Sequence, residues 1–211
     1  FVTPRQLPPT AVSRCPAQGS SAALGPKIFL AALLLIPVCA VAAPDPELWR
    51  SRAGDDPGWA RPEFDDSAWP LAPLPSTWRE QGRQGYDGMV WFRRELRLDE
   101  EARVAAGRDR LGLLLGPPTY GGFEAFAAGR LLGRSRGWAS ELPFGFPEVF
   151  RIPRSAIGEG GTLRLALRVR RVAWASDADP EAAPMGADLR LGLDRALEDR
   201  VRASWADHLL S

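Results

Sequence analysis

The sequence predicts an all-β domain, an antiparallel two-sheet sandwich of jelly-roll type that is followed by a short C-terminal helix. Three observations support this fold class. Several segments alternate apolar and polar residues with a period of two. The 21 glycines and 20 prolines fall mostly between these segments, as short strands joined by turns require. No long helical pattern separates the strands, which disfavours a doubly wound parallel sheet.

The N-terminal part has the pattern of a secretory signal peptide. Residues 1–27 contain three basic and no acidic side chains, and an apolar run over 28–43 closes on Ala40-Val41-Ala42. A basic flank, a short apolar core and a small-residue ending are typical of a cleaved export signal. We therefore expect a signal segment over 1–42 and an exported domain, periplasmic or extracellular. Membrane tethering through an uncleaved anchor is the alternative, although a spanning helix needs about 20 apolar residues.

The sandwich itself is expected over residues 43–193, and its strands follow in chain order. In the segment 90–98, Val90 and Phe92 alternate with Trp91 and Arg93. Such alternation is typical of an antiparallel strand with one buried and one solvated face. Residues 111–115 form a continuous apolar run, which indicates a more deeply buried strand.

The second half of the domain continues this pattern. Two short strands flank Ala128-Gly129, where glycine supplies the positive φ of a hairpin turn. A strand over 149–152 ends at Pro153, and a glycine-rich turn over 158–161 precedes an alternating strand over 163–169. A brief alternation over 189–193 predicts the last strand.

The C-terminal residues 194–211 are predicted to form an amphipathic helix. Leu197, Val201, Trp205 and Leu209 recur at a spacing of four and define one apolar stripe. The helix either packs on the sandwich or leads into a membrane segment beyond this chain.

Composition and charge exclude several classes of function. The 27 basic and 26 acidic residues are interleaved, so no long-range positive field exists to hold nucleic acid. One histidine and two cysteines exclude metal sites rich in these residues. No cofactor is expected. Asp65 and Asp66 are interpreted as turn and helix-cap oxygens, with a structural calcium ion as the alternative.

An ordered set of motifs resembles a known family. The pieces are WARPEFDDSAW over 59–69, LPSTW over 74–78, GYDGMVWFRR over 85–94, a hairpin over 123–133 and FRIPRSAI over 150–157. In this order they are similar to the N-terminal sugar-binding domain of glycoside hydrolase family 2, a galactose-binding-like jelly roll. The family commonly has Asn-Gly at the hairpin turn, whereas Ala128-Gly129 stands here.

The resemblance implies a non-catalytic domain that binds a carbohydrate or another small polar ligand. The family's catalytic carboxylates lie on a (β/α)₈ barrel of about 250 residues, so none can be carried onto this chain. Similar jelly rolls also occur as exported sensor domains of bacterial membrane receptors and phosphatases. We expect a ligand-sensing module of a longer membrane protein. The alternative is the accessory domain of a truncated, β-galactosidase-like family 2 enzyme.

The ligand is expected to bind in loops at one end of the sandwich, where function usually lies. Aromatic rings stack on sugars, and arginine and carboxylate side chains orient hydroxyl groups. The residues that combine these properties in loops are Trp138, Glu141, Arg83, Tyr86, Asp87 and Trp78.

An esterase is a further interpretation. Residues 133–137 match the G-x-S-x-G pattern around Ser135, with Asp177 or Asp188 and then His208 following. The nucleophile elbow needs a helix directly after the serine, but Pro143 and Pro147 follow closely. The motif therefore lacks the context of a nucleophile elbow, and the esterase interpretation is disfavoured.

Overall fold

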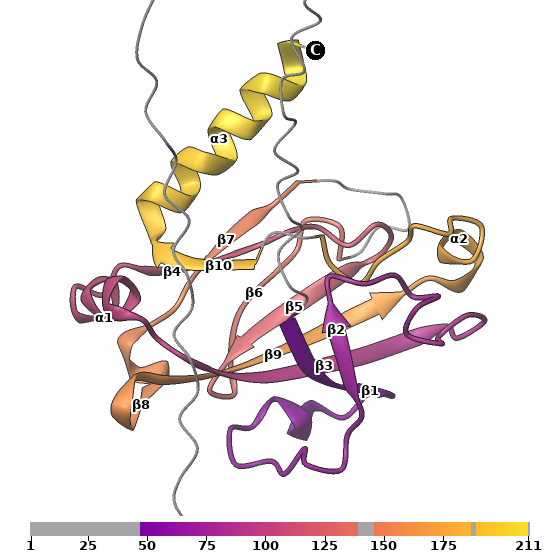
Figure 1. Ribbon diagram of the computed structural model, residues 1–211, viewed down its shortest axis with the longest axis horizontal. Coiled ribbons are helices and arrows are strands. Elements are labelled where there is room, and N and C mark those ends of the chain that lie inside the picture. The colour runs from indigo at the N-terminus through magenta and orange to yellow at the C-terminus, as the bar shows by residue number, and fades with distance from the viewer. Residues whose placement is uncertain (1–46, 139–145, 187–188, 211) are drawn as a thin grey trace, which may run out of the picture. The chain divides into compact units, whose positions relative to one another are not determined.

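The computed structural model describes residues 47–138, 146–186 and 189–210, and for 207–210 it describes the backbone alone. Within these ranges two antiparallel sheets form a sandwich, and a helix follows at the C-terminus (Figure 1). The predicted all-β fold class is thereby confirmed. The predicted signal segment over 1–42 and its boundary lie outside the described residues.

The larger sheet has seven strands, and the smaller sheet has three. The path through the larger sheet is β2 (Leu71–Leu74), β1 (Glu47–Ala53), β3 (Gly88–Arg97), β9 (Thr162–Arg171), β5 (Gly122–Ala127) and β6 (Arg130–Arg134), with β8 (Ile157–Gly158) also paired to β9. The order in the smaller sheet is β10 (Leu189–Leu193), β4 (Leu111–Leu115) and β7 (Glu148–Arg151). Neighbouring strands are antiparallel in both sheets.

The strands predicted from alternation are present, but several elements were not predicted, among them β1, β2 and α1. β2 has four residues and includes a proline, and β1 buries Ser51 while it exposes Leu48, so neither strand shows a clear apolar alternation. Helix α1 (Glu100–Gly107) joins the two sheets, and Asp99 caps it by accepting the Ala102 N–H at 2.8 Å. An aspartate before Glu100 and Glu101 is a helix-start signal that the sequence does offer.

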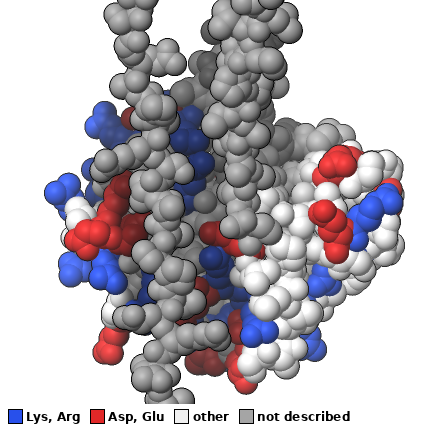
Figure 2. Space-filling model, viewed as in Figure 1, with Lys and Arg blue, Asp and Glu red and all other residues white. Residues whose placement is uncertain are grey.

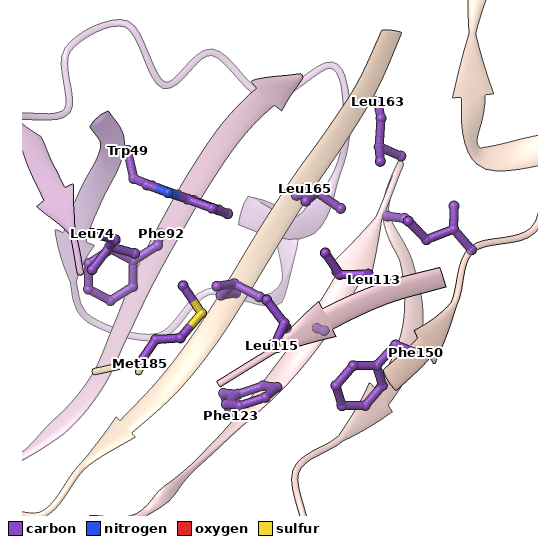
Figure 3. Close-up of a cluster of buried hydrophobic side chains, with 14 of the residues drawn as sticks. Trp49, Leu74, Phe92, Leu113, Leu115, Phe123, Phe150, Leu163, Leu165 and Met185 are labelled. Carbon is purple, nitrogen blue, oxygen red and sulfur yellow. The ribbon is translucent and has the colours of Figure 1, made fainter. Parts of the chain in front are cut away.

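The main hydrophobic core lies between the two sheets (Figure 3). Phe92 and Leu165 reach it from the larger sheet, and Leu113 and Leu115 face them from β4. Each of these side chains is 2% exposed or less. Burying such side chains removes apolar surface from water and holds the two sheets face to face.

The outer face of β3 differs from the expected solvated face. Trp91 is 0% exposed and Arg93 is 5% exposed, although both alternate with the inward residues. The connection between β1 and β2 folds over this face and covers it. The prediction of one wet face is therefore wrong for the first half of β3, because alternation shows which residues share a face but not what covers it.

Helix α3 (Asp194–Leu210) begins directly after β10 and confirms the predicted C-terminal helix. Its first turns pack on the outer face of the smaller sheet, where Leu197 is buried. A Cβ at Gly112 would lie 2.9 Å from the Asp194 Cα, so glycine permits this close approach. The helix then extends away from the sheets (Figure 1). No helix in the described ranges is long and apolar enough to cross a membrane.

Candidate functional site

Trp78, the first of the predicted ligand contacts, belongs to the core. Its side chain is 1% exposed and packs on Phe92 with 6.2 Å between ring centroids. Its backbone N–H donates to the Ala182 carbonyl at 2.8 Å. The guanidinium of Arg171 lies 5.7 Å from the ring centroid. Both the ring and the backbone of Trp78 therefore hold the end of the sandwich together.

Arg83, Tyr86 and Asp87 also use their polar groups within the protein. The Tyr86 hydroxyl donates to the Met89 carbonyl at 2.8 Å and accepts the Gly54 N–H at 3.1 Å. Arg83 donates to the Ser51 hydroxyl at 2.8 Å, and burial lowers the pKa of its guanidinium. Asp87 accepts the Ala173 N–H at 3.3 Å. The structure brings these predicted residues to one end of the sandwich.

Trp138 lies elsewhere, on the outer face of the larger sheet. Its ring contacts two guanidinium groups, with Arg168 at 5.3 Å and Arg134 at 5.9 Å from the centroid. A Cβ at Gly122 would lie 2.3 Å from the Trp138 Cα, so the chain crosses β5 closely at this point. Glu141 lies outside the described residues. Ligand contact by Trp138 and Glu141 stays a prediction.

A row of alternating charges crosses the outer face beneath Trp138. Strand register places Arg168 of β9 opposite Glu124 of β5, and Glu124 opposite Arg134 of β6. Arg168 donates to Glu124 at 2.7 Å and to Asp55 at 2.7 and 2.5 Å. Arg134 donates to Glu124 at 2.6 Å. Glu124, only 4% exposed, is thus held by two guanidinium groups.

Asp55 gives this row a pH dependence. Its hydrogen bonds with Arg168 hold the pKa of the Asp55 carboxyl below the ordinary value of 3.8. Because the folded-state pKa is the lower one, the ion pair stabilises the protein fully above the unfolded-state pKa of about 3.8. This stabilisation is lost as the pH falls through the folded-state pKa. We expect Asp55→Asn to lower the free energy of unfolding at neutral pH and to flatten its decline below pH 3.8. Chemical denaturation across this pH range measures both effects. Parallel curves for parent and variant would contradict the prediction.

An aromatic cluster covers the middle of the same face. Its buried side chains form a second, small hydrophobic core, which is separate from the core between the two sheets. Trp59 lies at its centre, with ring centroids 5.0 Å from Trp69 and 6.2 Å from Trp91, both edge to face. Phe126 of β5 stacks on Trp91 at 5.5 Å. The tryptophans of the 59–69 motif are therefore packing residues.

Arg93 anchors this cluster to the sheet. It is the buried cation of β3, and it forms an ion pair with Asp66 at 2.7 Å. It also donates to the backbone carbonyls of Trp59 and Phe64. Asp65 instead accepts the Ser67 N–H at 2.9 Å and closes a turn. These contacts hold residues 59–66 against the outer face of the larger sheet.

A polar crevice of about 460 Å³ opens beside this segment. Its volume is in the range of small-molecule sites. Strands β1, β3 and β9 form the floor, and residues 62–66 form one wall. The lining residues are Arg50, Pro62, Glu63, Phe64, Asp65, Asp66, Arg93, Arg94, Glu95, Arg164 and Leu165.

The crevice balances hydrogen-bond donors against acceptors. The side chains of Arg50, Arg93 and Arg164 face it together with four acidic residues, and Pro62 and Phe64 add apolar surface. The guanidinium of Arg94 lies on the inward face of β3, where it pairs with Glu47. Arg164 donates to Glu95 at 2.7 Å, and each of these side chains is 51% exposed. Basic and acidic side chains are also interleaved on the face of the domain that Figure 2 shows. Such a lining suits a neutral ligand that both donates and accepts hydrogen bonds.

Ser135 has a structural role in the fold. It is 5% exposed, and its hydroxyl accepts the Phe123 N–H at 2.9 Å. A turn follows it, not a helix, so the nucleophile elbow is not formed. The described part of the chain contains no group of three or more His, Cys, Asp or Glu suited to a metal ion.

Together these features define an all-β sandwich domain whose larger sheet carries a polar crevice on its outer face. No protein-family model matches the sequence, and no curated protein matches it.

Parts of several solved β-glucuronidases are similar to the domain. The Bacteroides uniformis enzyme is 22% identical over 70% of this chain and 16% of its own, with a TM-score of 0.45. The Bifidobacterium dentium enzyme is 20% identical over 60% of this chain and 19% of its own, with a TM-score of 0.46. The Ruminococcus gnavus enzyme is 19% identical over 60% and 20%, with a TM-score of 0.44. This chain spans a fifth or less of the length of these glycoside hydrolases. Their activity as β-glucuronidases is stated of those enzymes and not of this chain.

Proposed function

We propose that this chain is a non-catalytic module that binds a neutral, hydroxyl-rich ligand, such as a carbohydrate, in the outer crevice. The observation that carries the proposal is the lining, where guanidinium and carboxylate groups stand together beside Phe64 in about 460 Å³. A sugar hydroxyl can donate to a carboxylate and accept from a guanidinium at the same time. The apolar residues give a site for the C–H face of the ring.

The proposal places the module outside the cytoplasm, within a longer membrane-associated signalling protein. The apolar pattern over residues 28–43 supports export. Helix α3 is the element suited to pass on the bound state, because it starts at the end of β10 and then leaves the sandwich.

Binding is tested by thermal unfolding of the full 211-residue chain with neutral mono- and disaccharides. A ligand at 100 times its Kd stabilises by about 2.7 kcal/mol, which raises Tm by several degrees. We expect Arg164→Ala to abolish the increase without unfolding the protein, because an exposed ion pair contributes less than about 1 kcal/mol. Hydrogen exchange of the α3 amides in the same titration tests the coupling.

Two further variants locate the site. Arg130→Ala removes an exposed arginine of β6 outside the crevice, and it should respond to the sugar like the parent. Trp138→Ala changes a residue of the loop site that the sequence predicts, and it leaves the crevice lining intact. Loss of the response in Trp138→Ala but not in Arg164→Ala would overturn the crevice assignment. No response of the parent to any sugar would contradict the proposed function itself.

A further inference from the structure

Two exposed leucines lie on neighbouring strands at the edge of the larger sheet. Leu48 of β1 is 55% exposed and Leu71 of β2 is 54% exposed, which makes them the most exposed large aliphatic side chains of the described residues. The other exposed large apolar side chains lie singly on α1, on β6 and on α2 (Ala173–Ser176). An isolated apolar side chain on a surface is ordinary. A pair on adjacent strands is less so and points to something that covers it.

Strand register joins these leucines into one surface. Trp49 and Ala72, the core residues of β1 and β2 beside them, point inward, so Leu48, Leu71 and Pro73 all face outward. Leu48 is paired with Pro73, and Leu71 is therefore its diagonal neighbour across the two strands. Direct and diagonal neighbours on one face of a sheet lie within reach of each other's side chains. Leu48, Leu71 and Pro73 thus form one patch, the apolar margin.

The apolar margin borders the outer crevice at Arg50. This arginine lines the crevice, and it is also the cross-strand partner of Leu71. Leu48 lies two residues before it on the same face of β1. Arg50 donates to the Trp69 carbonyl at 2.9 Å, which ties its guanidinium to the segment that covers the outer face.

The margin also meets the crevice at β3. β1 and β3 are paired over residues 50–53 of β1, and continuing this register by two residues brings Leu48 level with Glu95. The ion pair between Glu47 and Arg94 holds the two strands together at this end. Glu95 lines the crevice. A ligand seated in the crevice can therefore reach the apolar margin while it stays on the same face of the sheet.

The margin suits a small molecule better than a protein partner. It consists of three residues, whereas each side of a standard protein interface supplies about 20–30 residues. β2 is an edge strand to which a second chain could add a strand. However, Pro73 has no N–H to donate, and proline in an edge strand discourages such pairing.

We propose that the ligand of the outer crevice is amphiphilic, with a neutral hydroxyl-rich head group in the crevice and a short aliphatic substituent on Leu48 and Leu71. This inference rests on the function proposed above and specifies the class of ligand. The crevice forms hydrogen bonds with the hydroxyl groups, and the margin removes the substituent from water. Each methylene that is buried there should tighten binding by about two- to four-fold.

The test compares n-alkyl β-glucosides and β-galactosides, from methyl to hexyl, in NMR titrations of the full 211-residue chain. The methyl glycoside serves as the reference for the head group alone. We expect Kd to fall by about two- to four-fold for each added methylene until the margin is covered. The methyl resonances of Leu48 and Leu71 should shift with the hexyl glycoside and stay in place with the methyl glycoside.

Substitutions on the sheet surface assign the gain to the margin. The double variant Leu48→Ser/Leu71→Ser should bind hexyl and methyl glycosides equally, and both changes are at exposed positions that the fold tolerates. Leu131→Ser is the matched control, because Leu131 is an exposed leucine of β6 at the other edge of the same sheet. It should keep the gain of the parent.

The outcomes separate this inference from the proposed function. Equal affinities of the parent for methyl and hexyl glycosides would overturn the inference and leave the proposed function standing. Absence of binding by every member of both series would overturn both. A hexyl gain that persists in Leu48→Ser/Leu71→Ser would place the substituent elsewhere. Hexyl binding that survives Arg164→Ala would show that the apolar group binds without the crevice, and each of these two results would also overturn the inference.

Discussion

Replacing Gly121 by alanine is expected to lower the free energy of unfolding by about 2–5 kcal/mol, the sum of two independent costs. Gly121 has a φ of +81°, a left-handed conformation that costs a side chain about 1–2 kcal/mol. An added Cβ would also lie 2.3 Å from the Arg170 carbonyl oxygen, which is backbone in the central strand β9. Relief of this clash would require moving a strand that is paired on both sides.

Gly82→Ala is the matched control for this prediction. Gly82 has a similar φ of +65°, but no atom lies within 4 Å of the position that an added methyl group would take. It should therefore show only the conformational cost of about 1–2 kcal/mol. Urea denaturation followed by tryptophan fluorescence measures both variants. Equal losses for the two glycines would show that the close approach to β9 contributes nothing.

Removing the carboxylate of Asp177 is expected to be nearly as damaging. Arg171 is 0% exposed, and Asp177 supplies the charge that balances it, while the Tyr86 carbonyl accepts a further hydrogen bond. Breaking a buried ion pair from one side costs about 3–5 kcal/mol, because a charge is left unpaired. The Asp177 side chain is 35% exposed, so we expect Asp177→Ala to lose about 3 kcal/mol, the lower end of that range.

The reason for this loss can be tested with two further variants. Asp179→Ala changes a nearby carboxylate with no buried counter-charge and should cost less than about 1.5 kcal/mol, the value of one hydrogen bond. Arg171→Met combined with Asp177→Ala should recover part of the stability, since no charge is then left buried. A double variant as unstable as the sum of its two single variants would exclude the charge as the cause.

The candidate ligand-binding residues were predictable from the sequence only in part. The loop residues Arg83 and Tyr86 were predicted as ligand contacts from their residue types, and the structure shows them bonded to Ser51 and Met89. Arginine and tyrosine serve loop packing as readily as ligand recognition, and the sequence does not distinguish these uses. The crevice beside Phe64 was not predicted, because its lining comes from three strands and one loop that are distant in the sequence.

Local sequence patterns were enough to predict the fold class, most of the strands and the C-terminal helix. The alternation over 163–169, the turn at Ala128-Gly129 and the spacing of Leu197 and Val201 are local patterns, and local backbone geometry follows from them. The packing role of Trp59, Trp69 and Trp91 was also predictable, since large rings in a strand-rich domain are usually buried.

Contacts between distant segments determine which faces are covered and where polar groups converge. Asp55 and Arg168 are 113 residues apart, yet their ion pair helps build the charged outer face. Arg93 is buried because a segment about 30 residues earlier folds over it and supplies Asp66 and two carbonyl groups. A period of two assigns residues to the two faces of a strand, but burial depends on what packs against each face, and that is set by contacts between distant segments.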